Sequence, residues 1–239
     1  MRDAELIWRF GAWIARRESG AARLGWSGGE LVLRIRQGRI QSAEGLDSAQ
    51  ISARLGCQSC GLRDLLGESR AIAAGRDVSE TQAMGAAKEV LQEALRGWLT
   101  DPHRELEIVE GQPDEADGPT ISITHAMVEL VLSDSGQVAR MVLPDRQLLL
   151  RRTGRFLDLY APLRLSEEAD LIVAKISGQR TVEEIASSSE HDPGEVERLL
   201  AALVATGMLE PAPLRRPVVT SLDEPSAEGD DETFPARRR

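Results

Sequence analysis

The chain has 239 residues, of which 41% are hydrophobic and 28% are charged, as in a globular protein with room for one large domain or two small ones. Its formal net charge of −10 argues against a protein that coats nucleic acid, because such a protein needs a basic surface. No apolar run approaches the length of a membrane-spanning helix, so membrane insertion is not expected.

The first predicted element is an amphipathic helix over residues 3–18. Its apolar residues recur at spacings of three and four, as on one face of a helix: Leu6, Ile7, Phe10, Trp13 and Ile14. Such a helix can lie on a membrane surface or pack on its own domain. We expect the second arrangement, because the polar face mixes both charge signs and contains no lysine. Charged residues among the apolar ones also argue against a signal peptide.

An antiparallel β-meander is predicted next. Residues 22–26 and 30–37 form strands on either side of a turn at Ser27-Gly28-Gly29, and residues 39–44 form a third strand after Gly38. Apolar and charged residues alternate in the second of these strands, so we expect one face of the sheet to be buried. The buried positions in that strand are predicted to be Leu31, Leu33 and Ile35.

Helices dominate the following part of the sequence. Glycines divide residues 47–75 into short helical pieces. A long helix begins at Ser79, where Ser-Glu-Thr-Gln (79–82) is a capping box, and ends near Thr100. Residues 104–110 then form a further strand, with two apolar side chains directed inward. The predicted buried residues of these two elements are Met84, Ala87, Leu91, Ala94, Leu95, Trp98, Leu106 and Ile108.

A change in composition marks the middle of the chain. Residues 111–119 are acidic and rich in glycine and proline, which predicts a linker or an exposed loop. A helix over residues 121–133 follows. Residues 148–151 and 156–160 are then predicted to form a β-hairpin about Thr153-Gly154.

Three further helices have clear starting signals. Ser166 precedes two glutamates, Thr-Val-Glu-Glu (181–184) is a capping box, and Asp-Pro-Gly-Glu (192–195) supplies a cap with proline at the first helical position. The third helix has a continuous apolar stripe and stops at Gly207, a residue type that ends helices. Its predicted stripe is Val196, Leu199, Leu200, Leu203 and Val204. Three short helices in this order predict a winged-helix-like module over residues 163–213.

Two short motifs match functional signatures but lack the required context. Gly25-Trp26-Ser27-Gly28-Gly29 fits G-x-S-x-G, yet a nucleophile elbow needs a helix after the serine, and here a strand is predicted. Cys57-Gln58-Ser59-Cys60 is a single C-x-x-C, whereas a structural zinc site needs four ligands. We therefore expect no catalytic, metal or cofactor site. Two cysteines also do not make a secreted disulfide framework, so a cytoplasmic location is expected.

The distribution of charge indicates one candidate contact site and disfavours a DNA-binding site. Arg151, Arg152 and Arg155 form a cluster that could contact a partner's carboxylate or a phosphate, or could simply face water. A winged-helix module can also bind DNA through its third helix. Residues 163–213, however, hold four basic residues against ten acidic ones, and this charge repels phosphate. No nucleic-acid partner is therefore expected.

The stretch from Leu6 to Glu110 resembles the PATAN domain, also called domain of unknown function 4388. Glycines and apolar positions make up the resemblance: Glu18-Ser19-Gly20, Leu31-Val32-Leu33-Arg34-Ile35, Gly38-Arg39-Ile40, Ala43-Glu44-Gly45 and Leu95-Arg96-Gly97-Trp98-Leu99. The family usually has aromatic residues in the strand after the tryptophan, where this chain has Leu106 and Ile108. Members commonly occur beside receiver domains or helical modules in bacterial signalling and motility, so the resemblance implies a protein-interaction module.

A second resemblance concerns the C-terminal part. The segment from Leu165 to Pro211 is similar to winged-helix peptide-binding modules of the PqqD-like kind. The similarity lies in Gly178-Gln179-Arg180-Thr181-Val182 and in Gly207-Met208-Leu209. It implies a module that recognises a peptide.

Together these observations predict an α+β fold, in which a small antiparallel meander with packed helices is followed by a winged-helix-like three-helix module. The expected parts are a PATAN-like domain (1–110), a linker (111–119), a connecting helix and hairpin (120–162), the module (163–213) and a disordered tail (214–239). We expect a non-enzymatic adaptor that binds another protein in bacterial signalling or surface motility. The alternative is a peptide-recognition chaperone, and a DNA-binding regulator is the least favoured hypothesis. The strong excess of arginine over lysine suggests a GC-rich bacterial genome.

Overall fold

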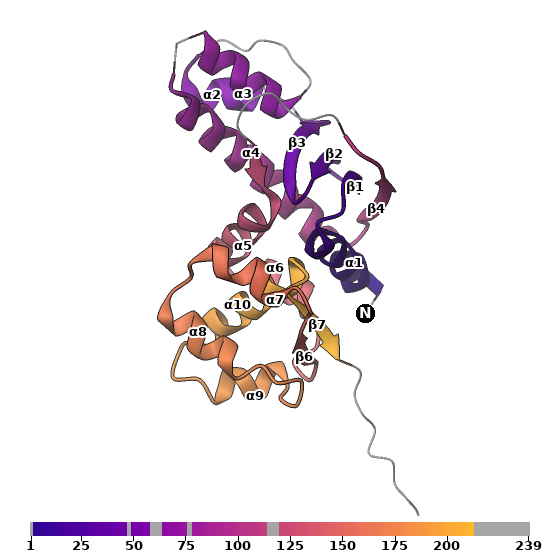
Figure 1. Cartoon of the computed structure of the whole chain (residues 1–239), viewed down its shortest axis with the longest axis vertical. Helices are drawn as coiled ribbons and strands as arrows, with labels where there is room; N and C mark the ends of the chain where they lie inside the picture. The colour runs from indigo at the N-terminus through magenta and orange to yellow at the C-terminus, as the bar shows by residue number, and fades with distance from the viewer. Residues whose placement is uncertain (1, 47–48, 58–63, 76–77, 114–119, 213–239) are drawn as a thin grey trace, which may run out of the picture.

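The computed structural model describes residues 2–46, 49–57, 64–75, 78–113 and 120–212. These residues form helices together with an antiparallel sheet of five strands, which confirms the predicted α+β class. A second, two-stranded sheet lies at the opposite end of the molecule from helices α2 and α3 (Figure 1). No helix in these ranges is both long and apolar enough to cross a membrane.

Five antiparallel strands form the main sheet, in the spatial order β4-β1-β2-β3-β5. Their bounds are Gly20–Trp26 (β1), Gly29–Arg36 (β2), Arg39–Glu44 (β3), Glu105–Glu110 (β4) and Ile121–Ser122 (β5). The predicted meander and the predicted strand after the long helix are both present. The prediction that the next helix starts at Ile121 is wrong by two residues, because Ser122 caps that helix and Ile121 pairs with Ile40 of β3.

One face of the sheet is covered by helix α1 (Arg2–Arg16) and helix α4 (Glu80–Thr100). The apolar positions predicted for the second strand are fully buried, and so are Ile7, Phe10, Trp13 and Ile14 of α1. Phe10 meets Trp98 of α4 edge to face, with ring centroids 5.4 Å apart. Each buried side chain of this size stabilises the fold by roughly 1.5–3 kcal/mol. Helix α1 therefore packs on its own chain, as expected, and does not offer its apolar face to a membrane.

The long helix begins where its sequence predicts. The Ser79 hydroxyl accepts a hydrogen bond from the backbone N–H of Gln82 (3.3 Å), and the Gln82 side chain accepts one from the N–H of Ser79 (3.0 Å). This reciprocal capping satisfies two N–H groups that would otherwise lack partners. Two shorter helices precede α4, α2 (Ala49–Leu55) and α3 (Leu65–Ala74), and both fall within the region predicted to contain short helical pieces.

The C-terminal part contains the three predicted helices with their predicted caps, Ser166, Thr181 and Asp192. Further elements surround them. The helices are α5 (Ile123–Ser133), α6 (Gln137–Val142), α7 (Phe156–Tyr160), the 3-10 helix η1 (Ala161–Leu163), α8 (Glu167–Ala174), α9 (Val182–Ser187) and α10 (Pro193–Ala205), and the strands are β6 (Leu149–Arg152) and β7 (Leu209–Ala212). Gly207 follows α10 in a left-handed conformation (φ 68°), as a helix-ending glycine does.

The predicted hairpin of residues 148–151 with 156–160 is wrong. Residues 156–160 are helix α7, in which Phe156 and Leu159 are buried at a helical spacing of three. The first of the two segments is indeed a strand, β6. It pairs antiparallel with β7, the strand that follows α10. The prediction failed because it paired neighbours in sequence, whereas the true partner lies beyond four α-helices and a 3-10 helix.

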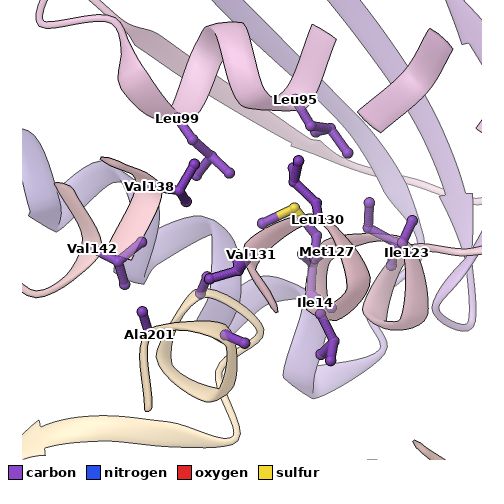
Figure 2. Close-up of a cluster of buried hydrophobic side chains, with 14 of the residues drawn as sticks. Ile14, Leu95, Leu99, Ile123, Met127, Leu130, Val131, Val138, Val142 and Ala201 are labelled. Atoms are coloured by element: carbon purple, nitrogen blue, oxygen red, sulfur yellow. The ribbon is translucent and has the colours of Figure 1, made fainter. Parts of the chain in front are cut away.

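A single hydrophobic cluster joins the parts of the chain on both sides of residues 111–119 (Figure 2). It includes Ile14 of α1, Leu99 of α4, Val131 of α5 and Ala201 of α10, and Leu99 lies beside Val138 of α6. Helix α10 packs against α5, α6 and α1, so its apolar stripe is covered largely by elements that precede residue 163. The C-terminal helices are thus built onto the N-terminal half through a shared core.

Two glycines allow the closest of these contacts. A Cβ atom on Gly207 would lie 2.2 Å from the backbone oxygen of Gly11, and one on Gly11 would lie 2.7 Å from the backbone oxygen of Ala205. Both distances are far below van der Waals contact. The end of α10 therefore touches α1 backbone to backbone, which only glycine permits at these positions.

Candidate interaction surfaces

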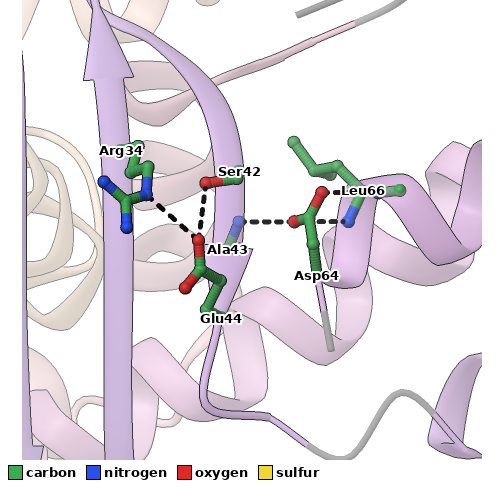
Figure 3. Close-up of polar contacts among 7 residues, drawn as sticks. Arg34, Ser42, Ala43, Glu44, Asp64 and Leu66 are labelled. Atoms are coloured by element: carbon green, nitrogen blue, oxygen red, sulfur yellow. Dashed lines mark hydrogen bonds and ion pairs between the residues drawn. The ribbon is translucent and has the colours of Figure 1, made fainter. Parts of the chain in front are cut away.

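The two margins of the five-stranded sheet differ, and the margin at β3 is closed. Beyond the short β5 pairing, the remaining edge of β3 is capped by Asp64, the residue before α3 (Figure 3). One oxygen of Asp64 accepts hydrogen bonds from the N–H groups of Ala43 (2.9 Å) and Leu66 (3.2 Å), and the other accepts from Gly67 (2.8 Å). A single carboxylate thus caps a helix and satisfies an edge group of the sheet.

The opposite margin of the sheet is formed by β4. This strand stands at one end of the strand order and lies at the margin of the upper part of the molecule (Figure 1). The Gly111 N–H donates to Ser19 O (3.2 Å), and backbone groups alternate along an antiparallel strand. The N–H and C=O groups of Leu106, Ile108 and Glu110 therefore point away from β1. Within the ranges that the structure describes, no other strand pairs with this edge.

The outer face of the sheet beside β4 is charged and contains a hollow. Arg23 of β1 lies between Glu30 (3.8 Å) and Glu107 (3.7 Å). Towards β3, Arg34 pairs with Glu44 at 3.0 Å (Figure 3). Val109 of β4 is 54% exposed, although it is a large apolar residue, and it lines a hollow of about 180 Å³ at the end of the strand. Strand β4 itself carries three glutamates: Glu105, Glu107 and Glu110.

The two margins of the two-stranded sheet also differ. At β6, the first residue forms a bridge with Thr181, and Val182 and Glu183 at the start of α9 donate hydrogen bonds to the backbone oxygens of Leu148 and Arg146 just before the strand, both at 3.0 Å. No described strand pairs with the outer edge of β7. That edge has only four residues, however, and Pro211 has no N–H to donate. It is a poorer template for a further strand than β4.

The three arginines predicted as a partner contact lie close together in the structure, on β6 and before α7, and each has a partner within the chain. The Nε of Arg151 lies 2.6 Å from a carboxylate oxygen of Glu210 on β7. Arg152 donates to the backbone oxygen of Val173 (2.6 Å), and its guanidinium carbon lies 5.2 Å from the centre of the Phe156 ring. Arg155 pairs with Asp158 at 3.2 Å. A contact with another protein by this cluster stays a prediction, and it would have to compete with these internal bonds.

Ser27 of the G-x-S-x-G match lies in the turn between β1 and β2, as predicted, with a strand after it. Asp101, at the end of α4, accepts hydrogen bonds from the backbone N–H groups of Ser27 (2.9 Å) and His103 (2.6 Å). The Ser27 side chain, together with these bonds, lowers the pKa of the Asp101 carboxyl. Asp101 thus links the turn at Ser27 to the turn at His103. The G-x-S-x-G match lacks the helix that a nucleophile elbow needs after the serine.

The C-x-x-C motif lies partly outside the described residues. Cys57 is half-buried with a free thiol, and Cys60 falls in the range that the structure does not describe. Among the residues that it does describe, no three His, Cys, Asp or Glu side chains come together as metal ligands would. Of the predicted linker, residues 111–119, the structure describes only residues 111–113. The predicted tail, residues 214–239, lies wholly outside the described ranges.

Comparisons with protein-family models, with curated proteins and with solved structures gave no match to this chain. The resemblance to the PATAN domain and to PqqD-like modules therefore rests on the sequence motifs alone. Function has to be argued from the surfaces described above, because a fold class does not by itself imply one.

Proposed function

We propose that this protein is a non-enzymatic adaptor that binds another protein by adding an extended segment of that partner to β4. The observation that supports the proposal is the difference between the two margins of the main sheet. Asp64 and β5 close the margin at β3. At β4, alternate residues of the six-residue strand direct backbone groups away from β1, and no other strand in the described ranges pairs with them. Main-chain hydrogen bonding to an exposed edge is a common mode of peptide recognition.

The chemistry of β4 favours a basic partner segment. Its three glutamates would repel a second copy of the same strand, which protects the edge from self-association. The same charges attract a strand that carries lysine or arginine. The glutamates therefore both disfavour pairing with a second copy of β4 and favour a basic partner. Val109 and the adjoining hollow supply an apolar contact for one partner side chain. We therefore expect the partner to present a short β-forming segment with alternating basic and apolar residues.

A role in bacterial signalling or surface motility follows from the resemblance to the PATAN domain and belongs to the same proposal. The second candidate function is peptide recognition by the C-terminal module, and the open edge of β7 is the observation that favours it. The proline within that strand and its short length make β4 the better candidate.

DNA binding is disfavoured on charge and on packing. The apolar stripe of α10 is buried, so only its polar side could meet a nucleic acid. That side presents Asp192 and Glu195 to solvent, and it also carries Glu197, which is paired with Arg146 at 2.8 Å. Acidic groups on the contacting helix would repel phosphate at every approach.

Selection of peptides from a random heptapeptide library on the full chain tests the proposal. We expect the selected peptides to be basic, to be rich in β-branched residues and to lose at least about tenfold in affinity for Glu110→Pro. That substitution removes an outward N–H and places a ring on the edge, while the N–H groups bonded to β1 remain. The matched control, Glu110→Ala, keeps the N–H and removes one exposed charge, and it should weaken binding less than about fivefold. Equal affinity for wild type and Glu110→Pro would refute the use of this edge.

A further inference from the structure

A pocket of about 280 Å³ lies on a different surface from β4, between the β2–β3 turn, the start of α5 and the segment of α7 and η1. Residues that are distant in sequence meet there. Its polar lining consists of Arg17, Gln37, Arg39, Ser122, Thr124 and His125. No aspartate or glutamate is among the residues that line it.

Both arginines of this pocket are held by neutral oxygen atoms. Arg17 donates from Nη2 to the backbone oxygen of Asp158 (3.3 Å). Arg39 donates from Nε to the Thr120 hydroxyl (2.5 Å) and from Nη2 to the Thr120 backbone oxygen (3.2 Å). These bonds orient the two guanidinium groups without cancelling their charge, and they leave further N–H groups on each available to a ligand.

Several other arginines on the described surface are paired with carboxylates. Arg34 lies 3.0 Å from Glu44, and Arg16 lies 3.0 Å from Glu18. The carboxylate of Asp158, whose backbone contacts Arg17, pairs instead with Arg155 at 3.2 Å. Two positive charges therefore face one pocket without a carboxylate in its lining, which gives the pocket a positive potential.

The start of α5 adds to that potential. Ser122 caps this 11-residue helix by accepting a hydrogen bond from the N–H of His125, and its hydroxyl lies 3.0 Å from His125 Nδ1. The positive end of the helix dipole is thus directed at the same space as the guanidinium groups. His125 lines the pocket and can donate from its ring.

We infer that this pocket binds the phosphate group of a small phosphorylated molecule. Guanidinium groups match phosphate oxygens with paired N–H donors, and two of them can balance the charge of a phosphate dianion. The volume of about 280 Å³ is at the small end for ligand sites, so it suits a phosphate with a small attached group better than a nucleotide. The inference is independent of the proposed use of β4, since the two sites share no residue.

Inorganic phosphate is the first probe, titrated into the full chain at constant ionic strength with chloride as the reference anion. We expect saturable changes in the amide NMR signals of residues 37–39 and 122–125. Arg17→Gln should weaken phosphate binding at least about tenfold, because one charge-assisted contact is lost. Arg17 is exposed and donates only to a backbone oxygen, so this variant should fold normally. Arg9→Gln changes an exposed arginine on helix α1, which precedes Arg17; this variant is the control and should bind like wild type.

Three results would overturn the inference. The first is the absence of saturable binding. The second is an equal loss in Arg9→Gln and Arg17→Gln, because general screening then accounts for the signal. The third arises when free phosphoserine is compared with a phosphoserine-containing heptapeptide. Tighter binding of the free amino acid, or equal binding, supports a small-molecule site, whereas binding of the peptide more than about tenfold tighter would assign the pocket to a protein ligand.

Discussion

At the scale of single residues, two aspartates join segments of the chain by accepting backbone hydrogen bonds. Asp64 and Asp101 each accept hydrogen bonds from backbone N–H groups of segments that are distant in sequence. Asp64 joins β3 to α3, and Asp101 joins the β1–β2 turn to the end of α4. Hydrogen bonds to a charged acceptor contribute more to stability than neutral ones. These two residues therefore help to fix the sheet on its helices.

The lowered pKa of Asp101 predicts a definite dependence on pH. A carboxyl whose pKa is lower in the folded state stabilises the fold above its unfolded pKa, 3.8, and loses this effect as the pH falls through the folded value. We expect Asp101→Asn to be less stable than wild type at pH 7 and the difference to shrink below about pH 4. Urea unfolding of both proteins between pH 3 and pH 7 measures this. A difference that stays constant over that range would show that the charge of Asp101 is not involved.

At the scale of elements, local signals predicted helix starts well and strand partners poorly. Ser79, Thr181 and Asp192 were identified because a cap and its bonding partner lie within three residues of each other. The pairing of β6 with β7 was missed because it depends on how the four α-helices and the 3-10 helix between them fold. Helix α6 was also missed, since its six residues give too short an apolar pattern to distinguish a helix from a loop.

For the proposed binding surface, the strand could be predicted from the sequence, but its position in the sheet could not. The strand at 104–110 was expected with Leu106 and Ile108 inward, and both side chains are indeed half-buried. That β4 would lie at the margin of the sheet could not be derived, because position in a sheet is a property of tertiary pairing. The glutamates at both ends of the strand were the available signal, since charge is a usual feature of edge strands.

Helix α10 offers a test of the packing. Leu200 is fully buried in the shared core, so Leu200→Asp should reduce the free energy of unfolding by about 4 kcal/mol or more, through a cavity and a buried polar group. The control Leu171→Asp lies on α8, where the side chain is 63% exposed, and should change stability by no more than about 0.5 kcal/mol. Chemical denaturation of both variants measures the difference. A Leu200→Asp protein as stable as wild type would place that face of α10 on the surface.

At the scale of the whole molecule, one core connects the parts that the sequence suggested were separate. Helix α10 rests on α1, α5 and α6, and the contact between Gly11 and Gly207 brings two backbones together. The cluster runs from the helices that cover the sheet to the C-terminal helices, so the two parts share one core. The anion pocket lies at this junction, while β4 occupies the far margin of the same sheet.

The central claim is that β4 is the strand to which a partner adds. Hydrogen exchange of individual amides, with and without a selected basic peptide, tests it most directly. We predict that the peptide slows exchange of Leu106, Ile108 and Glu110, whose N–H groups point away from β1. Slowed exchange in residues 209–212 with no change in β4 would show that the partner does not add to β4 and would instead support peptide recognition by the C-terminal module.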